Sequence, residues 1–332
     1  MNQFTCNKTK VYLVIFTILM ALLILNISCQ NDQQKIPQNT SDLKGTISIS
    51  GAFALYPLTV KWAEEFQKIH PAVRIDVSAG GAGKGLTDAL SGMVDLGMVS
   101  RAITPAEEER GVWWVAVTKD AVLPTISASN PVLTVLKEKG LTRQDFLEIY
   151  IDNSMTIWGK ATDTPNNDKI NVYTRSDACG AAQTWAAYLG GSQESLKGVG
   201  VFGDPGLADA VKNDPQGIGF NNTIYIYNQT TKAKYEGLEV IPIDINENGL
   251  VDAEENFYDS MDQVIDAIAT GKYPSPPARE LNLVAKGQPS SPLVVKFLNW
   301  ILTEGQKFVL EAGYVPLEKN RILTELEKLS SK

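Results

Sequence analysis

Three short segments, in each of which a predicted strand turns through small residues into a predicted helix, constrain the fold of this chain most. They are Gly51–Leu58, Ala79–Gly85 and Tyr173–Ala181. The first turn of a helix presents N–H groups without intrahelical partners, at the positive end of the helix dipole. Three such turns, with Arg101 and Arg175 nearby in the sequence, are suited to enclosing an anion. The sequence therefore favours the capture of a small anion.

The first 28 residues have the layout of an export signal. Lys8 and Lys10 make its start basic, residues 11–25 are uncharged and apolar, and a small residue precedes Cys29. A cysteine at this place predicts a bacterial lipoprotein in which Cys29 becomes the lipid-bearing first residue. The alternative is an uncleaved anchor, but fifteen apolar residues are fewer than the roughly 20 that span a bilayer. We expect a cell-envelope protein, in the periplasm or on the outer face of the membrane, that contacts the membrane only through its lipid anchor.

Composition excludes several classes of function. The 332-residue chain carries a formal net charge of −8, which disfavours nucleic acid as a partner. A negative net charge does not exclude an anion as ligand, because arginines and helix starts can make the field at a binding site locally positive. His70 is the single histidine, which removes most catalytic triads and any His-rich metal site. We therefore expect no enzyme, with a hydrolase or phosphatase as a remote alternative.

The order of the predicted elements indicates two α/β lobes. Between residues 45 and 100 strand, helix, strand, helix and strand alternate, which predicts a parallel sheet with crossover connections. The expected divisions are a signal peptide at 1–28, a tether at 29–43, a first lobe at 44–125 plus 278–332, and a second lobe at 126–277.

Further elements follow from turn residues and apolar periodicity. Pro57 is in the favoured first-turn position of a helix. The face that this helix buries is expected to comprise Leu58, Trp62, Phe66 and Ile69. A long helix is expected over residues 292–312, ended by Gly313. Two apolar runs, 113–117 and 122–127, are separated by a charged pair.

Several stretches together resemble the extracytoplasmic phosphate-binding proteins of ABC transporters. The stretches are 51–57, 88–101, 175–180, 204–211 with 217–220, and 312–317, and the resemblance covers about residues 45–320. It implies an α/β protein with the type II periplasmic-binding-protein fold, in which two lobes close over a ligand in the cleft between them. It also implies a protein, expected as a monomer, that captures phosphate or a related oxyanion and delivers it to an ABC permease in the inner membrane. Two alternatives are a lipid-anchored sensor on the same fold and a binding protein re-specified for another anion.

The resemblance implies ligand-binding positions in the small-residue turns. They are Ala54, Leu55, Gly81, Ala82, Gly83, Ser100, Arg101, Arg175, Asp177, Cys179, Gly180 and Ala181. Hydroxyl-bearing residues of the family are replaced here by Ala54 and Leu55 in the first turn, Ala82 in the second, and Cys179 and Ala181 in the third. The family's proton-accepting Asp is replaced by Ser100 or Arg101. Backbone N–H donors survive these changes, whereas the loss of a carboxylate acceptor relaxes discrimination between anions.

Arg175 is the predicted ionic anchor, because a guanidinium matches an oxyanion with two parallel hydrogen bonds. The alternative is a surface salt bridge with Asp177. Arg101 follows a strand end, where open α/β sheets bind ligands, or else it is a charge on the rim or hinge. Cys179 is the one cysteine of the expected folded part, so no disulfide is expected. Cys179 is either a reactive thiol or a packed small residue. Lys84 could reach the pocket, but a solvated loop lysine is the simpler interpretation.

A twelve-residue segment of the expected second lobe matches the calcium-loop pattern D-x-[DN]-x-[DN]-G-x5-E in full. Its ligand positions are Asp244, Asn246, Asn248, the carbonyl of Leu250, Asp252 and Glu255. Oxygen donors at these spacings surround Ca²⁺ in such loops, and Gly249 permits the sharp turn. The alternative is an acidic Asn-Gly turn. We predict a structural calcium ion and no organic cofactor.

Overall fold

The computed structural model describes residues 43–331. The predicted signal peptide, the predicted lipidation site Cys29 and all but the last residue of the predicted tether lie outside the described residues. The described part forms a mixed α/β fold with sheet order β2-β1-β3-β9-β4-β7-β5-β6 and β8 beside β4. No helix within residues 43–331 is long and apolar enough to cross a membrane.

The first three strands form the parallel arrangement that the sequence predicts. β1 (Gly45–Gly51) pairs in parallel with β2 (Val73–Ala79) and with β3 (Leu96–Val99). The crossovers are the helices α2 (Tyr56–Ile69) and α3 (Ala82–Ser91). Because α3 begins at Ala82, most of the second small-residue segment is the first turn of the helix rather than a loop before it.

Helix α2 buries the predicted face with one exception. Pro57 lies in its first turn, and Leu58, Trp62 and Phe66 are fully buried. Ile69 is 56% exposed, so its predicted place in the core is wrong. Ile69 is the last residue of the helix, where the core no longer covers the side chain.

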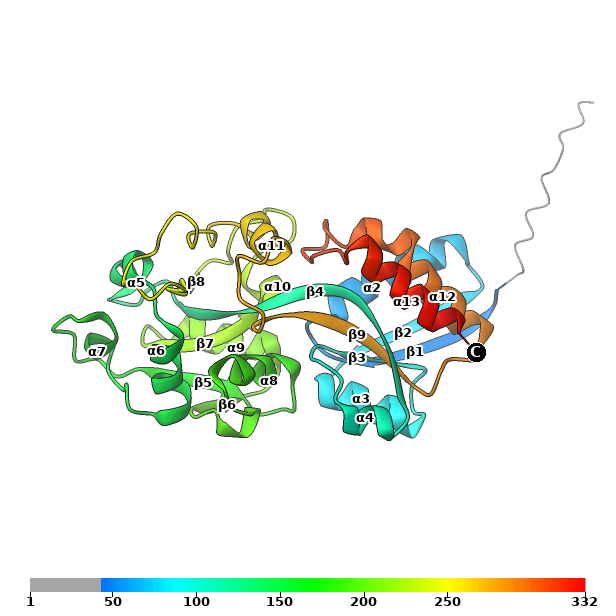
Figure 1. Cartoon of the computed structure of the whole chain (residues 1–332), viewed down its shortest axis with the longest axis horizontal. Helices are drawn as coiled ribbons and strands as arrows, with labels where there is room; N and C mark the ends of the chain where they lie inside the picture. Colours follow the sequence, from blue (N-terminus) through cyan, green and yellow to red (C-terminus); the bar gives the residue numbers. More distant parts are fainter. Residues whose placement is uncertain (1–42, 332) are drawn as a thin grey trace, which may run out of the picture. The chain divides into compact units, whose positions relative to one another are not determined.

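The two apolar runs on either side of Lys119-Asp120 form one continuous strand. β4 (Val112–Ser127) is 16 residues long and pairs antiparallel with β9 (Ala278–Lys286) along its first part. The charged pair does not interrupt the strand, because Asp120 lies in register with Arg279 on β9. β9 also pairs antiparallel with β3, so β4 and β9 connect the first three strands to the rest of the sheet (Figure 1).

A second group of strands continues from the end of β4. β7 (Gly217–Asn222) and β8 (Leu238–Val240) each pair antiparallel with β4. β5 (Asn171–Arg175) pairs in parallel with β7 and with β6 (Val199–Val201). The helices of this part are α5 (Leu133–Lys139), α6 (Arg143–Leu147), α7 (Trp158–Thr162), α8 (Gly180–Leu189), α9 (Gly203–Asn213), α10 (Thr223–Ile226) and α11 (Met261–Ala269).

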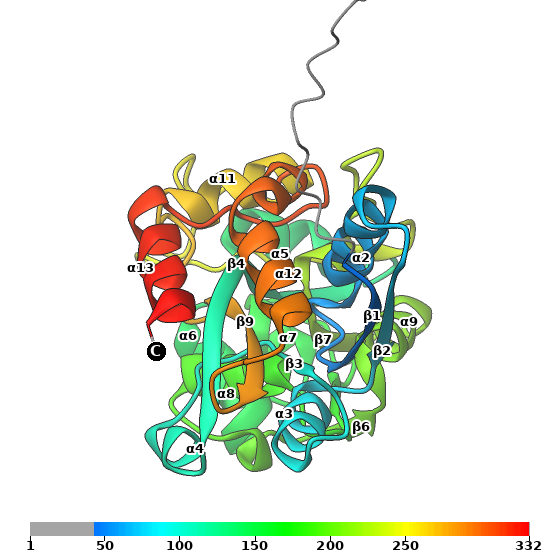
Figure 2. The ribbon, with the colours of Figure 1, turned by 90° about the vertical axis from the view of Figure 1, so that its right-hand side faces the viewer.

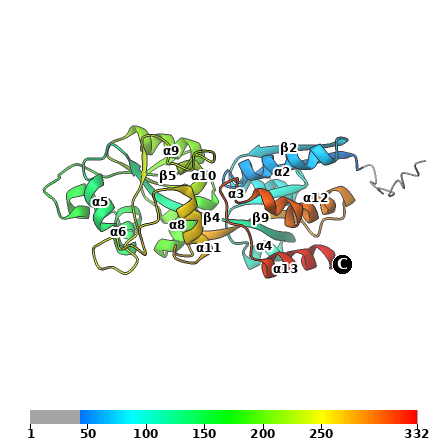
Figure 3. The same ribbon diagram turned by 90° about the horizontal axis from the view of Figure 1, so that it is seen from above.

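Two hydrophobic cores lie on either side of β4 and β9. One draws mainly on residues 121–278, with the helices of the second strand group around it. The other draws mainly on 47–117 and 281–329, and α2 lies beside α12 (Pro292–Leu302) over the first strand group (Figure 3). α4 (Pro105–Glu109) precedes β4 at the edge of this second core.

The long helix predicted over residues 292–312 is broken. α12 ends at Leu302, Thr303 has a non-helical ψ of −93°, and a 3₁₀ segment follows at Glu304–Phe308. A terminal helix that the sequence analysis missed, α13 (Lys319–Ser330), packs beside α12 (Figure 2). It is held by the buried Glu325, whose Oε2 accepts a hydrogen bond from the Ala116 N–H of β4 at 3.2 Å.

Candidate anion-binding site

The three small-residue turns predicted from the sequence lie together. The N–H of Gly83, at the start of α3, donates to the carbonyl of Ala178, just before α8, at 3.0 Å. The ring of Phe53, between β1 and α2, lies 5.6 Å from the guanidinium carbon of Arg175 at the end of β5. The turns after β1 and β2, from the first strand group, therefore meet the turn after β5, from the second strand group.

Two glycines allow this close approach. Gly81, the N-cap of α3, has a φ of +94°, and a methyl group there would lie 2.8 Å from Oδ2 of Asp177. A methyl group at Gly180 would collide with the carbonyl and hydroxyl oxygens of Ser100, which is itself buried. Any larger residue at either position would push the facing segments apart.

Arg175 is the centre of the site, and its side chain is wholly buried. Its Nε and Nη2 donate to the two carboxylate oxygens of Asp177 at 2.9 and 2.7 Å, and Nη1 donates to Asp204 at 2.6 Å. The salt bridge with Asp177 considered above thus exists, but in the interior rather than at the surface. A guanidinium has five N–H groups, so two remain for another acceptor.

Burial and charge oppose each other in this cluster. Burial would lower the pKa of Arg175, but the facing carboxylates of Asp204 and Asp177 raise it, so the guanidinium stays charged. Burial also raises the pKa of Asp204, which Arg175 only partly offsets. Asp177 additionally accepts the N–H of Gly203 at 3.2 Å, and it therefore positions Arg175 rather than facing a ligand.

A buried polar network, which sequence reasoning missed, leads from Arg175 to β9 and β4. Asp204 accepts a hydrogen bond from the Asn222 side chain, and Asn222 in turn accepts one from Arg279. Arg279 on β9 donates from Nε to Asp120 on β4 at 2.9 Å. The one signal in the sequence was an acidic residue between two apolar runs, because a carboxylate there needs a buried partner.

The helix starts retain some free N–H donors. In α8 the thiol of Cys179 accepts the Ala182 N–H at 3.3 Å. Within the described chain no acceptor is hydrogen-bonded to the N–H groups of Gly180 and Ala181, which remain for a ligand. In α3 the Ala82 N–H is equally free, whereas that of Gly83 is taken by the opposite segment.

Two predicted positions offer little to a ligand. The side chains of Ala54 and Leu55 are buried in the core. The Leu55 N–H donates to the Ala52 carbonyl at 3.2 Å, and the Ala54 carbonyl accepts from the hydroxyl of Tyr314 at 2.8 Å. The first turn therefore reaches the site through Phe53, which the sequence analysis did not single out.

The other two predicted basic residues are already paired. Arg101 binds both carboxylate oxygens of Glu107 at 2.9 and 2.7 Å, so its guanidinium is not free for an anion. Burial opposes the ionised form of Glu107, but hydrogen bonds from Arg101 and Thr104 lower its pKa overall. Lys84 forms an ion pair with the largely buried Asp88 and does not reach Arg175.

Cys179 is a packed residue. It is buried, and burial raises the pKa of its thiol to about 12. Since the thiolate is the reactive form, the thiol is inert at neutral pH. Of the two alternatives given for Cys179, the geometry supports a small packed side chain at a helix start rather than a reactive thiol.

A small cavity of about 120 Å³ opens beside these turns. Gly83, Arg101, Cys179 and Gln183 contribute to its lining. Arg175, whose side chain is wholly buried, is not among its lining residues.

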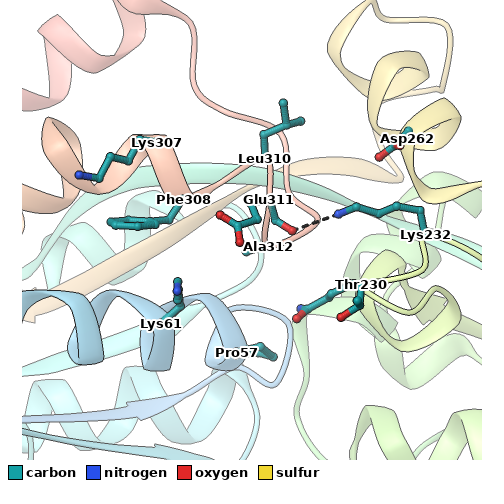
Figure 4. Close-up of a pocket in the computed structure, with 11 residues that line it drawn as sticks. Pro57, Lys61, Thr230, Lys232, Asp262, Lys307, Phe308, Leu310, Glu311 and Ala312 are labelled. Carbon is teal, nitrogen blue, oxygen red and sulfur yellow. Dashed lines mark hydrogen bonds between the residues drawn. The ribbon is translucent and has the colours of Figure 1, made fainter.

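A larger cavity, of about 710 Å³, lies elsewhere (Figure 4). Lys61, Lys232 and Phe308 are among its lining residues, and Lys232 Nζ donates to the carbonyl of Glu311 at 3.0 Å. It contains none of the residues predicted for ligand or metal binding. Its size alone does not make it the candidate site.

The predicted calcium loop follows β8, a strand rather than a helix. Asp244 is buried and accepts the N–H groups of Asn248 and Gly249 at 3.2 and 2.8 Å. Glu255 is also buried and accepts the Asn246 N–H at 3.0 Å. Within residues 43–331 no group of three or more His, Cys, Asp or Glu side chains is arranged to hold a metal ion. The carboxylates Asp244 and Glu255 thus bind loop N–H groups in this arrangement.

Known proteins resemble this chain over most of its length. A family model described as a PBP superfamily domain matches residues 37–304. Phosphate-binding protein PstS of Bacillus subtilis is 24% identical over 323 residues, covering 93% of this chain and 95% of that protein. Phosphate-binding protein PstS of Methanocaldococcus jannaschii is 26% identical over 367 residues, covering 94% and 93%.

Solved structures show the same fold. A putative phosphate ABC transporter substrate-binding protein with bound phosphate, from Clostridium perfringens, matches with a TM-score of 0.68 at 22% identity, covering 82% of this chain and 100% of that one. This likeness confirms the predicted type II periplasmic-binding-protein fold. With the family model matching far more than half of the sequence, the chain belongs to the PBP superfamily, as a divergent relative of the phosphate-binding proteins of ABC transporters, and it is a solute-binding protein rather than an enzyme.

Proposed function

We propose that this protein captures phosphate or a related oxyanion outside the cytoplasm and delivers it to the permease of an ABC importer. The observation that carries the proposal is the meeting of the α3 and α8 starts next to the buried Arg175. Helix starts supply neutral N–H donors, and the guanidinium supplies the charge, so an oxyanion would be bound without a hydroxyl or metal ligand. The names of the Bacillus and Methanocaldococcus relatives point to the same ligand class.

Capture requires the two lobes to separate and close again. Opening would break the hydrogen bond from the Gly83 N–H to the Ala178 carbonyl and separate the ring of Phe53 from the ring of Phe202 and the guanidinium of Arg175. A bound oxyanion would take over N–H donors of Ala82, Gly180 and Ala181. Closure over the ligand would present one rigid surface to a permease in the inner membrane, with the protein acting as a monomer.

The proposed location is the cell envelope. The basic start, apolar run and Cys29 of the sequence support a lipoprotein signal, with the mature chain tethered through a lipid on Cys29. Mass spectrometry of the protein purified from membranes would test this. A mature chain that begins at residue 29 with a diacylglycerol adduct supports it, and an intact residue 1 overturns it.

Calorimetric titration tests the capture of an oxyanion. The purified protein, freed of bound ligand by dialysis after partial unfolding, is titrated with phosphate, sulfate, molybdate and tungstate. Arg175→Lys keeps a charge for Asp204 but loses the forked geometry, so binding should weaken at least tenfold. The matched control is Arg74→Lys, which replaces an exposed arginine. Binding that is unaffected by Arg175→Lys, or absent for all four anions, contradicts the proposal.

We also propose that the 244–255 loop takes up a structural calcium ion. Support comes from the full match to the loop pattern and from the buried Asp244 and Glu255. Binding would require these carboxylates to exchange loop N–H groups for the ion, which is favourable only if all six oxygen positions contribute. The ion would brace the loop, with no part in capturing the anion.

A further inference from the structure

One half-buried glutamine holds both ends of the turn that leads into α8. The side chain of Gln193 donates from Nε2 to the carbonyl of Asp177 at 2.7 Å. Its Oε1 accepts the N–H of Cys179 at 3.1 Å. Within residues 43–331 neither of these two backbone groups has another hydrogen-bond partner. A single side-chain amide therefore closes the turn formed by residues 177–179.

Only an amide in one orientation can make both of these bonds. The accepting oxygen must face the N–H of Cys179, and the donating nitrogen must face the carbonyl of Asp177. A carboxylate only accepts hydrogen bonds, so it could satisfy the N–H but not the carbonyl. An apolar side chain would leave both backbone groups unpaired.

The segment that carries Gln193 is itself fixed. A short 3₁₀ segment begins at this residue (Gln193–Ser195), and the Gln193 carbonyl accepts the N–H of Leu196 at 3.2 Å. Leu196 is buried in the core of the second strand group. The N–H of Lys197 donates to the carbonyl of Tyr150 at 2.6 Å. The glutamine therefore reaches the turn from an anchored piece of backbone.

The turn closed in this way supplies the second strand group's part of the candidate site. Asp177 holds Arg175 through its carboxylate, and the carbonyl of Ala178 accepts the N–H of Gly83 from α3. Cys179 is the N-cap of α8, so its position sets the direction of the free N–H groups in the first turn of that helix. Both the charge and the N–H donors offered to an anion thus depend on residues 177–179.

We propose that Gln193 is a positioning residue of the anion site, which fixes residues 177–179 so that Arg175 and the first N–H groups of α8 are held ready for the oxyanion. It acts through Asp177 and Cys179. Being uncharged, it holds the turn without adding a negative charge that would repel the ligand. This inference rests on the proposed capture of an oxyanion and adds a residue on which its affinity depends.

Calorimetric titration with inorganic phosphate at pH 8 and pH 5.5 tests the proposal, with each variant compared with the unmodified protein at the same pH. Gln193→Leu removes both bonds and should weaken binding by about tenfold at either pH. Gln193→Glu should be at least as weak at pH 8, where an ionised carboxylate faces the carbonyl of Asp177. The same carbonyl raises the pKa of the introduced carboxyl group. At pH 5.5 its protonated form can donate to that carbonyl, so the loss of affinity should shrink by about threefold or more.

Two other glutamines provide the controls. Gln183 is an exposed residue of α8 that lines the same cavity of about 120 Å³ as Gln193. Gln183→Glu therefore reports the effect of an added charge alone. Gln144→Leu removes an exposed side-chain bond to Glu148 and should change phosphate affinity by less than about twofold. Urea denaturation of every variant separates a loss of stability from a loss of affinity in the folded protein.

The outcomes separate this inference from the proposed function. If Gln193→Leu binds phosphate as tightly as the unmodified protein, Gln193 is not a positioning residue, but capture of an oxyanion stands. The same conclusion follows if the affinity of Gln193→Glu recovers at pH 5.5 no more than that of Gln183→Glu. If Gln193→Leu does not fold, Gln193→Glu decides. If phosphate does not bind to the unmodified protein, phosphate capture is wrong and this inference fails with it.

Discussion

Asp177 holds Arg175 through both of its carboxylate oxygens, at 2.9 Å from Nε and 2.7 Å from Nη2, while the arginine side chain is wholly buried. The residues are two positions apart, so the pair is local in sequence. Asp204, which binds the remaining nitrogen, comes 29 positions after Arg175. The anchor of the site is therefore fixed in place by one local and one distant carboxylate.

Removing the anchor should destabilise the fold as well as abolish binding. Arg175→Met leaves Asp177 and Asp204 buried without a counter-charge, which costs about 3–5 kcal/mol in the free energy of unfolding. Urea denaturation measures this. The control Arg74→Met, which breaks an exposed pair, should change stability by less than about 1 kcal/mol. Equal effects of the two substitutions would show that the buried cluster is not what the geometry indicates.

The two ends of α3 offer a matched pair of glycine substitutions. Gly81 and Gly92 both have positive φ, at +94° and +74°, but only Gly81 has a neighbour within 4 Å of an added methyl group. Gly92→Ala should cost about 1–2 kcal/mol of stability, the usual penalty of a left-handed residue. Gly81→Ala should cost more and also weaken anion binding, because the methyl group would displace Asp177. Denaturation and phosphate titration of both variants check this, and indistinguishable variants would contradict it.

The buried ion pair between Asp120 of β4 and Arg279 of β9 is suited to a double-mutant cycle. Asp120→Leu or Arg279→Met alone strands a buried charge and should cost about 3–5 kcal/mol, whereas the double variant should recover much of the loss. The comparison pair is Glu280 with Arg321, which is partly exposed and should contribute only about 0–1 kcal/mol. A double variant as unstable as the sum of its single variants would rule out direct coupling.

The thiol of Cys179 should be inert in the folded protein. Its pKa is raised to about 12 by burial, against an ordinary value of 9.0. In a chain carrying Cys6→Ser and Cys29→Ser, alkylation by iodoacetamide at pH 8 should be at least a hundredfold slower than in urea. Labelling at similar rates in both conditions would mean that the site opens freely.

The same shift predicts how stability depends on pH. Below pH 9 the thiol is protonated in both the folded and the unfolded state, so Cys179 has no effect. Above pH 9 only the unfolded thiol ionises, so its contribution to stability falls by up to about 1.4 kcal/mol per pH unit until pH 12. Cys179→Ser should lack this part of the alkaline loss, as denaturation at pH 8 and pH 10 would show.

Calcium should raise the midpoint of thermal unfolding if the 244–255 loop binds it. A concentration of one hundred times the dissociation constant stabilises the folded state by about 2.7 kcal/mol. Glu255→Gln should abolish the shift, because it removes a two-oxygen ligand. Asp163→Asn, at a highly exposed carboxylate, should not. No shift at millimolar calcium would favour the simple Asn-Gly turn.

The alternation of strand and helix, the helix start at Pro57 and the meeting of the small-residue turns were all evident from the sequence. The first two features depend on residues within one turn of helix or one strand. The meeting of the turns was expected from their common pattern of helix starts, but the turn after β5 reaches the other two from the second strand group, which local sequence does not specify. The buried helix face at Leu58, Trp62 and Phe66 follows from 3.6-residue periodicity in the same way.

Only the tertiary structure decided which donors and charges of the site are free. Glu107 neutralises Arg101, the carbonyl of Ala178 accepts the N–H of Gly83, and within residues 43–331 no donor reaches the buried Oδ1 of Asn282. The break at Thr303 precedes Gly305, a poor helix former, whose carbonyl accepts a hydrogen bond from the distant Trp62 indole at 2.9 Å. Most such pairings join residues that are far apart along the chain. A local sequence pattern therefore does not specify which acceptor pairs with a given donor in the folded protein.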